Sequence, residues 1–162
     1  MIFTKTFIND LHVIELEPRV DERGYFSRVF CQDEFKKAGL EHNIVHINRS
    51  FNKIKGTVRG LHFQRGPMAE VKIVQCIKGK IFDVVVDLRS DSPTFKKWFS
   101  IELTEDNKKL IYIPKGFAHG IQILADNSTL EYFVTQFYSP AHEGGIRWND
   151  PTIGINWPLP VT

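Results

Sequence analysis

Apolar and polar residues alternate with a period of two along most of the chain. The segment "IFDVVVDL" places Asp83 and Asp87 on one side of an extended chain and Phe82 and Val84 on the other. Further segments of this kind are "WFSIEL", "KLIYIP", "FAHGIQIL" and "LEYFVTQF", with turn residues between them. Many short strands at even spacing predict an all-β protein built as a sandwich or closed double sheet, the jelly roll among them.

Turn and helix signals punctuate these strands. In "VKIVQCIKGKIFDVVVDL", two apolar runs are joined by residues 78–80, which predicts a β-hairpin. The segment "VDERGYF" predicts a second turn. Only "QDEFKKAGL" favours a helix, because acidic residues occupy its first turn, lysines its last, and Gly39 follows. The final stretch "RWNDPTIGINWPLP" is rich in Pro, Gly and Trp and predicts packed irregular structure.

The composition is that of a globular protein. A length of 162 residues fits one domain spanning residues 1–162 and is long enough to bury a core. The net charge is only +2 and the basic residues never form a run, so nucleic acid is not an expected partner. No apolar stretch approaches the roughly 18 residues that a membrane span needs, so we expect no membrane association.

The cysteines and the first residues favour a cytoplasmic location. Cys31 and Cys76 fit neither a disulfide framework nor a zinc site. Because Cys76 lies in an apolar run, we expect a reduced thiol in the core. The start "MIFTKTFIND" lacks the long apolar segment of a signal peptide.

Polar residues interrupt one strand-like segment, "VRGLHFQRGPMAEVK". Such a segment is either a solvated edge or the wall of a pocket. Lys72 shares a strand face with Val74 and Cys76, and a lysine that faces an apolar interior is costly unless its charge is used or paired. The alternative is an edge lysine whose ammonium group reaches water.

Two histidines and an arginine raise the same question. His62 lies between apolar neighbours, where a hydrogen-bonded core histidine is the alternative to a functional one. His119 follows a tight Pro-x-Gly turn, just inside the next strand. Strict alternation puts Arg59 on the face opposite His62, unless Gly60 marks a bulge that turns both side chains the same way. Periodicity leaves both possibilities open, and Tyr132 is a core or rim residue on the same grounds.

Five segments in order carry a resemblance to a known family. They are "DERGYFSRVF", "GTVRGLHFQ", "VKIVQCIKGKIFDVVVDLRSDSPTFKKW", "IYIPKGFAHG" and "YSPAHEGGIRWNDPTIGINWP". From about Arg19 to Pro158 the chain resembles the dTDP-4-dehydrorhamnose 3,5-epimerase family. The resemblance implies a cupin-type jelly roll with one or two short helices and a homodimer that exchanges N-terminal strands. It also implies an isomerase that inverts C3 and C5 of a nucleotide-linked, dTDP-type 4-keto-6-deoxy sugar.

The resemblance also implies roles for individual residues. His62 matches the family's general base, Tyr132 its acid, and Lys72 the lysine beside the sugar 4-keto oxygen. The implied substrate contacts are Arg23 and Arg59 at the diphosphate, His119, Glu143 and Asn48 in the pocket, and Tyr138 against the base. No metal and no cofactor are implied.

The chemistry of such a reaction suits these residue types. A proton beside a ketone can be removed only if the enolate oxygen is stabilised, and one fixed donor such as Lys72 is typically worth ~3 kcal/mol. Inversion takes a proton from one face of the ring and returns one to the other, so a base and a separate acid are needed. Planar guanidinium groups suit a diphosphate and fix the position of the sugar.

Three departures from the family pattern stand out. Arg28 occupies a position where the family usually has Glu, so a different sugar or nucleotide is possible. The segment "INRSFNKIKG" is one residue longer than the common pattern, which bears on Asn48. The family continues into a Ser-x-Lys-Asp segment whose aspartate orients the catalytic histidine. We expect that the sequence is cut short before that segment, and Asp83 is the alternative partner of His62.

Three rival functions remain. A metal-dependent cupin needs a His-x-His pair, but the second position is Gln64, and His119 with Glu70 makes a short ligand set. A non-catalytic nucleotide-sugar-binding protein would keep the fold and lack the orienting carboxylate. A single-carbon 3- or 5-epimerase acting on a different nucleotide sugar is the closest rival.

Overall fold

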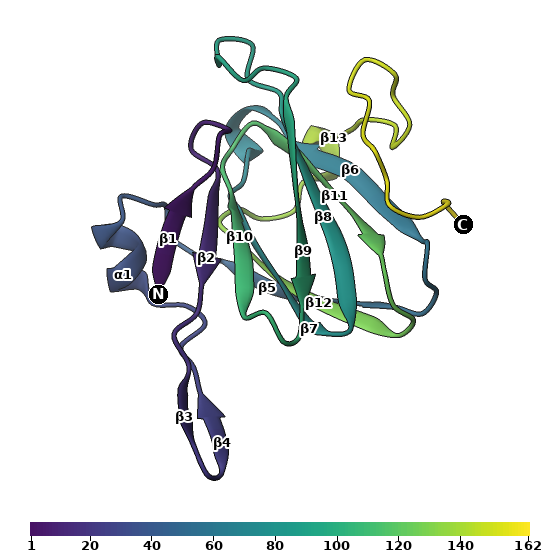
Figure 1. The fold of residues 1–162 in the computed structure, drawn as a ribbon. Coiled ribbons are helices and arrows are strands. Elements are labelled where there is room, and N and C mark those ends of the chain that lie inside the picture. Colours follow the sequence, from purple (N-terminus) through teal and green to yellow (C-terminus); the bar gives the residue numbers. More distant parts are fainter.

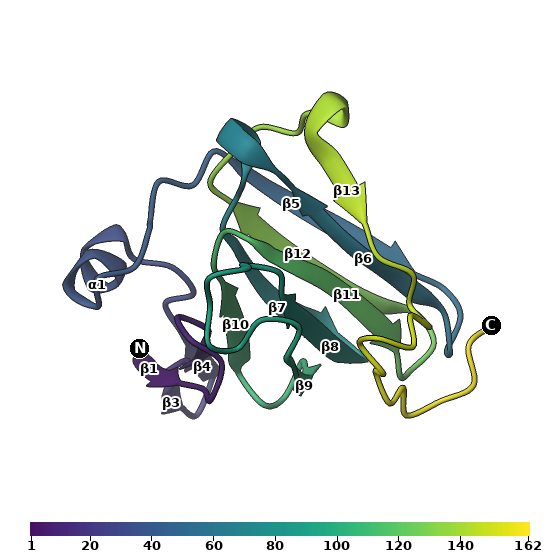
Figure 2. The ribbon, with the colours of Figure 1, turned by 90° about the horizontal axis from the view of Figure 1, so that it is seen from above.

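Two β-sheets face each other in the computed structural model, which describes residues 1–162. Figure 2 shows the two layers from above, and the ribbon is traced in Figure 1. The six-stranded sheet has the order β1 (Ile2–Lys5), β2 (His12–Glu15), β10 (Lys109–Ile113), β7 (Lys72–Lys78), β12 (Ser128–Val134), β5 (His46–Asn52). The five-stranded sheet has the order β13 (Glu143–Gly145), β6 (Val58–Gln64), β11 (Phe117–Ile123), β8 (Lys80–Asp87), β9 (Trp98–Thr104). The predicted all-β jelly roll of the cupin type is confirmed.

The main hydrophobic core fills the space between the sheets. It contains Val74 and Ile111 from the six-stranded sheet and Val85 and Ile121 from the five-stranded one. Because successive side chains of a strand point to opposite faces, Lys72 lies on the same inward face as Val74, as the alternation predicts. The core occupies one part of this space, and polar side chains occupy the other.

Both outer faces of the sandwich are partly covered. The short helix α1 (Gln32–Lys37) buries Phe35 against the six-stranded sheet, and Gly39 follows it with a φ of 72°. The helix prediction is therefore confirmed. Residues 146–162 form no strand and pack Ile155 and Trp157 over the five-stranded sheet. The two 3-10 turns are η1 (Gly66–Met68) and η2 (Pro140–His142). No helix has the length and hydrophobicity to cross a lipid bilayer.

The turn at Gly79 is not the hairpin that the sequence predicts. Strand β7 belongs to the six-stranded sheet and β8 to the five-stranded one, so the turn is a corner between the sheets. Gly79 has a φ of 77°, and a Cβ there would collide with the hydroxyl of Ser128. That hydroxyl also accepts a hydrogen bond from the backbone N–H of Lys80 at 3.1 Å. Two apolar runs around a short turn look alike in a hairpin and in a corner, since only the partner strands differ.

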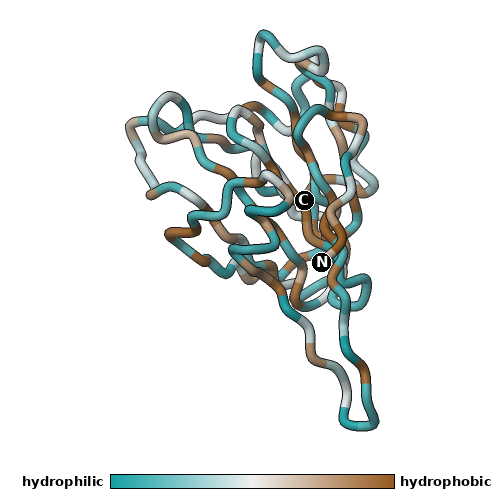
Figure 3. The backbone as a smooth tube through the Cα atoms, turned by 90° about the vertical axis from the view of Figure 1, so that its left-hand side faces the viewer, coloured by the Kyte–Doolittle hydropathy of each residue, from teal (hydrophilic) through white to brown (hydrophobic).

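A two-stranded arm projects from the body of the protein (Figures 1 and 3). It consists of β3 (Arg19–Asp21) and β4 (Gly24–Phe26), which pair only with each other. The predicted turn in "VDERGYF" lies at its tip. By contrast, β1 and β2 join the sheet of their own chain through β10.

The two cysteines are free, and Cys76 lies in the core. Burial raises the pKa of the Cys76 thiol to about 11. The predicted position of the Cys76 thiol in the core is confirmed.

Candidate active site

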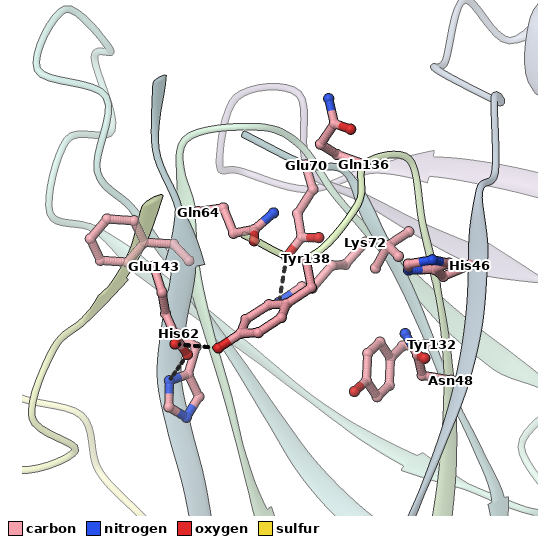
Figure 4. Close-up of a pocket in the computed structure, with 12 residues that line it drawn as sticks. His46, Asn48, His62, Gln64, Glu70, Lys72, Tyr132, Gln136, Tyr138 and Glu143 are labelled. Carbon is pink, nitrogen blue, oxygen red and sulfur yellow. Dashed lines mark hydrogen bonds and ion pairs between the residues drawn. The ribbon is translucent and has the colours of Figure 1, made fainter. Parts of the chain in front are cut away.

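A pocket opens between the sheets at the end where polar side chains replace the core. It comprises two adjoining hollows of about 450 and 510 Å³, and His62, Lys72 and Tyr132 line both. His62 extends from β6 in one sheet, whereas Lys72 and Tyr132 extend from β7 and β12 in the other. Figure 4 shows His62 and Tyr132 on opposite sides of the pocket. The structure therefore brings together the three residues that the resemblance selects.

His62 stands at the open side of the pocket. Its side chain is 58% exposed, and its Nδ1 lies 3.7 Å from the Oε1 of Glu143, which is ion-pair rather than hydrogen-bond distance. Glu143 is in turn held by the Tyr138 hydroxyl, which donates to Oε2 at 2.8 Å (Figure 4). The same hydrogen bond raises the pKa of Tyr138. Glu143 and Tyr138 thus lie together beside His62, as expected of pocket residues.

Gln64 holds the loop that carries Tyr138. Its Oε1 accepts from the backbone N–H of Ser139 at 2.6 Å, and its Nε2 donates to the carbonyls of Phe137 and Met68 at 3.0 and 2.9 Å. The side chain is buried. Both ends of the amide are therefore used by backbone groups. Since a metal ligand at this position would have to give up these bonds, the donor set of a metal-dependent cupin is not offered here.

Lys72 has a carboxylate partner inside the pocket. Its Nζ lies 2.9 Å from the Oε1 of Glu70, and the two side chains are only 18% and 11% exposed. The lysine is thus neither an edge residue nor an unpaired buried cation. Glu70 lines the pocket, whereas the sequence suggests it only as a metal ligand. Its spacing of two from Lys72 on an extended segment was the available signal for pairing.

His119 is tied to a fully buried carboxylate. Its Nε2 lies 2.8 Å from the Oδ2 of Asp83, which is completely buried in β8, and Oδ1 of Asp83 has no partner. Burial raises the pKa of Asp83, although the nearby His119 and Lys72 act in the opposite direction. The sequence-based alternative, Asp83 as the partner of His62, is wrong. Asp83 of β8 is the cross-strand partner of Ile121, which lies two residues from His119 on β11. The carboxyl group therefore lies beside His119 and not beside His62.

A bulge at Gly60 turns Arg59 into the pocket. The pairing of β6 with β11 runs from His119–His62 to Ile121–Arg59, so β6 carries one extra residue between these pairs. Gly60 has a φ of 127°, and a Cβ there would lie 2.6 Å from the Cα of Gly120. Of the two possibilities left open by the sequence, the bulge is the one found, and Arg59 lines the second hollow.

Asn48 also lines the pocket, next to Tyr132. The two residues are cross-strand partners in β5 and β12. Within the longer segment "INRSFNKIKG", the register of β5 with β12 runs without interruption from Asn52 back to His46.

The structure does not bring two other residues to this pocket. Arg23 lies at the tip of the β3–β4 arm, is 83% exposed and pairs with Asp21 at 2.6 Å. Arg28 pairs with Glu34 at 3.1 Å, next to the base of the arm. Within one chain, neither residue contributes to the pocket between the sheets.

A jelly roll with a histidine, a lysine and a tyrosine converging between its sheets defines a cupin-type epimerase. The family model for dTDP-4-dehydrorhamnose 3,5-epimerase matches residues 5–162. The chain belongs to the dTDP-4-dehydrorhamnose 3,5-epimerase family, which is a family of isomerases acting on carbohydrates.

Individual relatives agree with this assignment. The dTDP-4-dehydrorhamnose 3,5-epimerase of Salmonella typhimurium is 47% identical over 162 residues, which cover 98% of this chain and 87% of that protein. The crystal structure of the enzyme from Elizabethkingia anophelis gives a TM-score of 0.95 at 38% identity and covers 99% of this chain and 87% of that one.

Two further solved structures contain sugar nucleotides. The Legionella pneumophila epimerase in complex with dTDP-4-keto-L-rhamnose gives a TM-score of 0.93 at 37% identity, with 99% and 86% of the two chains covered. A 3'-monoepimerase from Streptomyces bikiniensis in complex with dTDP-quinovose gives 0.91 at 29% identity, with 98% and 80% covered. The resemblance inferred from the sequence is confirmed at the level of family and fold.

Proposed function

We propose that this protein inverts C3 and C5 of a dTDP-linked 4-keto-6-deoxy sugar without a metal or cofactor. The observation that carries the proposal is the arrangement of His62 and Tyr132 on opposite sheets with the Lys72 ammonium group in the same pocket. A base and an acid on opposite sides of a bound ring are what inversion requires. Family membership supports the same reaction.

The proton transfers proceed in a defined order. His62 takes the proton from the carbon beside the ketone, and the electron pair of the broken C–H bond moves into the enolate. Lys72 donates a hydrogen bond to the enolate oxygen, which lowers the barrier by ~3 kcal/mol. Tyr132 returns a proton to the opposite face of the same carbon, and its phenolate regains a proton that His62 has released to solvent. Each transfer contributes about 10²–10⁴-fold.

The remaining pocket residues bind the substrate. Arg59 has no ion-pair partner within the chain, so its charge is available for the diphosphate. His119 contacts the sugar from the wall of the pocket. Asn48 and Glu143 lie where polar atoms of the sugar or the base would be bound, and the ring of Tyr138 offers a flat face for the base.

We also propose a homodimer in which the β3–β4 arm reaches the pocket of the second subunit. An isolated two-stranded arm is marginally stable in water. Val20, Tyr25 and Phe26 on this arm are 76%, 58% and 68% exposed, and a second copy of the chain would cover them. The exchange would involve β3 and β4 alone, since β1 and β2 pair within their own chain. Arg23 would then serve the partner's diphosphate.

Mixed dimers test this exchange. Co-expression of Arg23→Ala chains with His62→Asn chains gives heterodimers with one site that combines an intact His62 with an intact Arg23. If the arm acts in the partner's pocket, activity returns to about a quarter of the wild-type value, since half of the dimers carry one such site. Mixtures that stay as inactive as the two parent variants would show that Arg23 does not act across the dimer.

Deuterium incorporation tests the reaction itself. The protein is incubated in heavy water with a dTDP-linked 4-keto-6-deoxy sugar, and the deuterium is located by NMR. We expect label at both C3 and C5, with inversion. Label at one carbon only would identify a single-carbon epimerase like the monoepimerase relative. Tight binding without label would identify a non-catalytic nucleotide-sugar-binding protein.

Chelation tests the absence of a metal requirement. Because the Gln64 amide is bonded at both ends, we expect that treatment with a chelator leaves the epimerisation rate unchanged within about twofold. A large loss that added divalent metal restores would contradict the proposed mechanism.

A further inference from the structure

Arg59 is held at a single atom. Its Nε donates to the Oδ1 of Asn52 at 2.5 Å, and this is the only hydrogen bond that its side chain makes. The two terminal nitrogens have no partner within the chain. They are the pair of donors that a guanidinium group presents to a phosphate in bidentate contact.

Asn52 is itself rigidly placed. It is the last residue of β5, is only 2% exposed and pairs in register with Ser128 of β12. Its Nδ2 donates to the backbone carbonyl and the hydroxyl of Ser50, both at 3.3 Å. Both ends of this buried amide are therefore occupied, and the oxygen that faces Arg59 has no freedom to turn away.

The bulge and the amide fix different properties of the arginine. The bulge at Gly60 determines that the side chain of Arg59 enters the pocket. A long side chain that enters a pocket can still adopt many rotamers. A hydrogen bond to Nε removes most of them and sets the plane of the guanidinium group, while it leaves both terminal nitrogens free. An unpaired arginine would have to lose this freedom on binding, which weakens affinity.

We propose that Asn52 is a positioning residue that fixes the Arg59 guanidinium group for a nucleoside diphosphate. The proposal rests on the diphosphate-binding role of Arg59 in the proposed function. The competing explanation is that Asn52 only stabilises the connection between β5 and β6.

A double-mutant cycle separates these explanations, with dTDP as the probe and calorimetry as the measurement. Asn52→Ala is made in the wild-type and in the Arg59→Ala protein. We expect Asn52→Ala to weaken dTDP binding about 10-fold in the wild-type protein and less than twofold when Arg59 is absent. Asp126→Ala is the matched control, because the Oδ1 of Asp126 accepts a hydrogen bond at 2.7 Å from the backbone N–H of Lys55 in the β5–β6 connection, and its loss leaves the bond to Arg59 intact. It should change the affinity less than twofold.

Thermal unfolding verifies that each variant is folded. If Asn52→Ala does not fold, Asn52→Ser replaces it, because a serine keeps a polar group in the buried site and is too short to reach Arg59. An equal loss of dTDP affinity in both backgrounds, or no loss in either, overturns the positioning role. If Arg59→Ala alone leaves dTDP binding unchanged, the diphosphate role of Arg59 in the proposed function fails instead, and the two failures are thus distinguishable.

Discussion

His62 and His119 occupy directly opposed positions on β6 and β11, yet their surroundings differ sharply. The side chain of His62 is 58% exposed, and its nearest carboxylate is 3.7 Å away and also largely exposed. The side chain of His119 is 13% exposed and bonded at 2.8 Å to a carboxylate that is completely buried. Two histidines on neighbouring strands therefore differ in their exposure and in how firmly a carboxyl group holds the ring.

This difference indicates how the fold divides the chemistry. The Nδ1 of His62 faces Glu143, so its Nε2 is available to take a proton from a substrate. The Nε2 of His119 is engaged with Asp83, so this ring is suited to hold a substrate in place. Under the proposed function, this cross-strand pair combines the base with a second histidine that Asp83 holds in place. Four predictions test this division.

The largest effect is expected when the two histidines are exchanged for asparagine. His62→Asn removes the base and should lower kcat about 10³-fold or more. His119→Asn removes a substrate contact and should lower kcat only about 10-fold. Turnover and deuterium exchange are measured for both variants. Equal losses would show that the structural difference between the histidines has no catalytic meaning.

Lys72→Met should lower turnover about 10²–10³-fold, because the enolate loses its cation. Binding of dTDP should stay within about threefold of wild type, since the proposed function places Lys72 at the sugar and not at the diphosphate. Glu70→Gln is the matched control, because it removes the partner of Lys72 and leaves the cation in the pocket. A Lys72→Met variant that loses affinity but keeps its turnover would make the lysine a binding residue only.

Tyr132→Phe extends the comparison across the pocket. If His62 alone removes protons, this variant should lose about 10² in the rate of inversion but still exchange substrate protons with solvent. The ratio of exchange to inversion, followed by NMR in heavy water, is the measurement. Inversion at the wild-type rate would remove Tyr132 from the acid role.

The smallest effect concerns how the contribution of Asp83 to the stability of the folded protein changes with pH. Burial raises the pKa of Asp83 above its ordinary value. An acid with a raised pKa in the folded state contributes stability that is complete below its unfolded pKa and is lost as the pH rises through its folded pKa. The melting temperature of wild type relative to Asp83→Asn should therefore decrease by a few degrees as the pH rises above about 4, the ordinary pKa of an aspartate. A difference in melting temperature that does not change with pH would contradict this prediction.

One pocket residue and several local elements could be predicted from short stretches of the sequence. The period of two placed Lys72 on the inward face with Val74, and the acidic start and lysine-rich end of residues 32–37 identified the one helix. These are local properties, because each depends on the order of side chains within a few residues. The same holds for the turn that became the tip of the β3–β4 arm.

What could not be predicted depends on which strands meet. The corner at Gly79 looks like a hairpin until β7 and β8 are assigned to different sheets. Asp83 bonds to His119 and not to His62 because β8 pairs with β11. Asn52 gave no signal at all, since its contact with Arg59 follows from the path between β5 and β6 and from the bulge at Gly60.

The corner at Gly79 also has a consequence for the kinetics of folding. Because β7 and β8, like most consecutive strands of the chain, lie in different sheets, each large sheet contains only one pair of strands that are consecutive in the chain, β1–β2 in one sheet and β8–β9 in the other. Every other pairing joins segments that are distant in sequence, so long loops have to close before the sheets gain stability. Chains of this kind refold in milliseconds to seconds rather than microseconds. The topology that places β7 and β8 in different sheets therefore also makes this protein a slow folder.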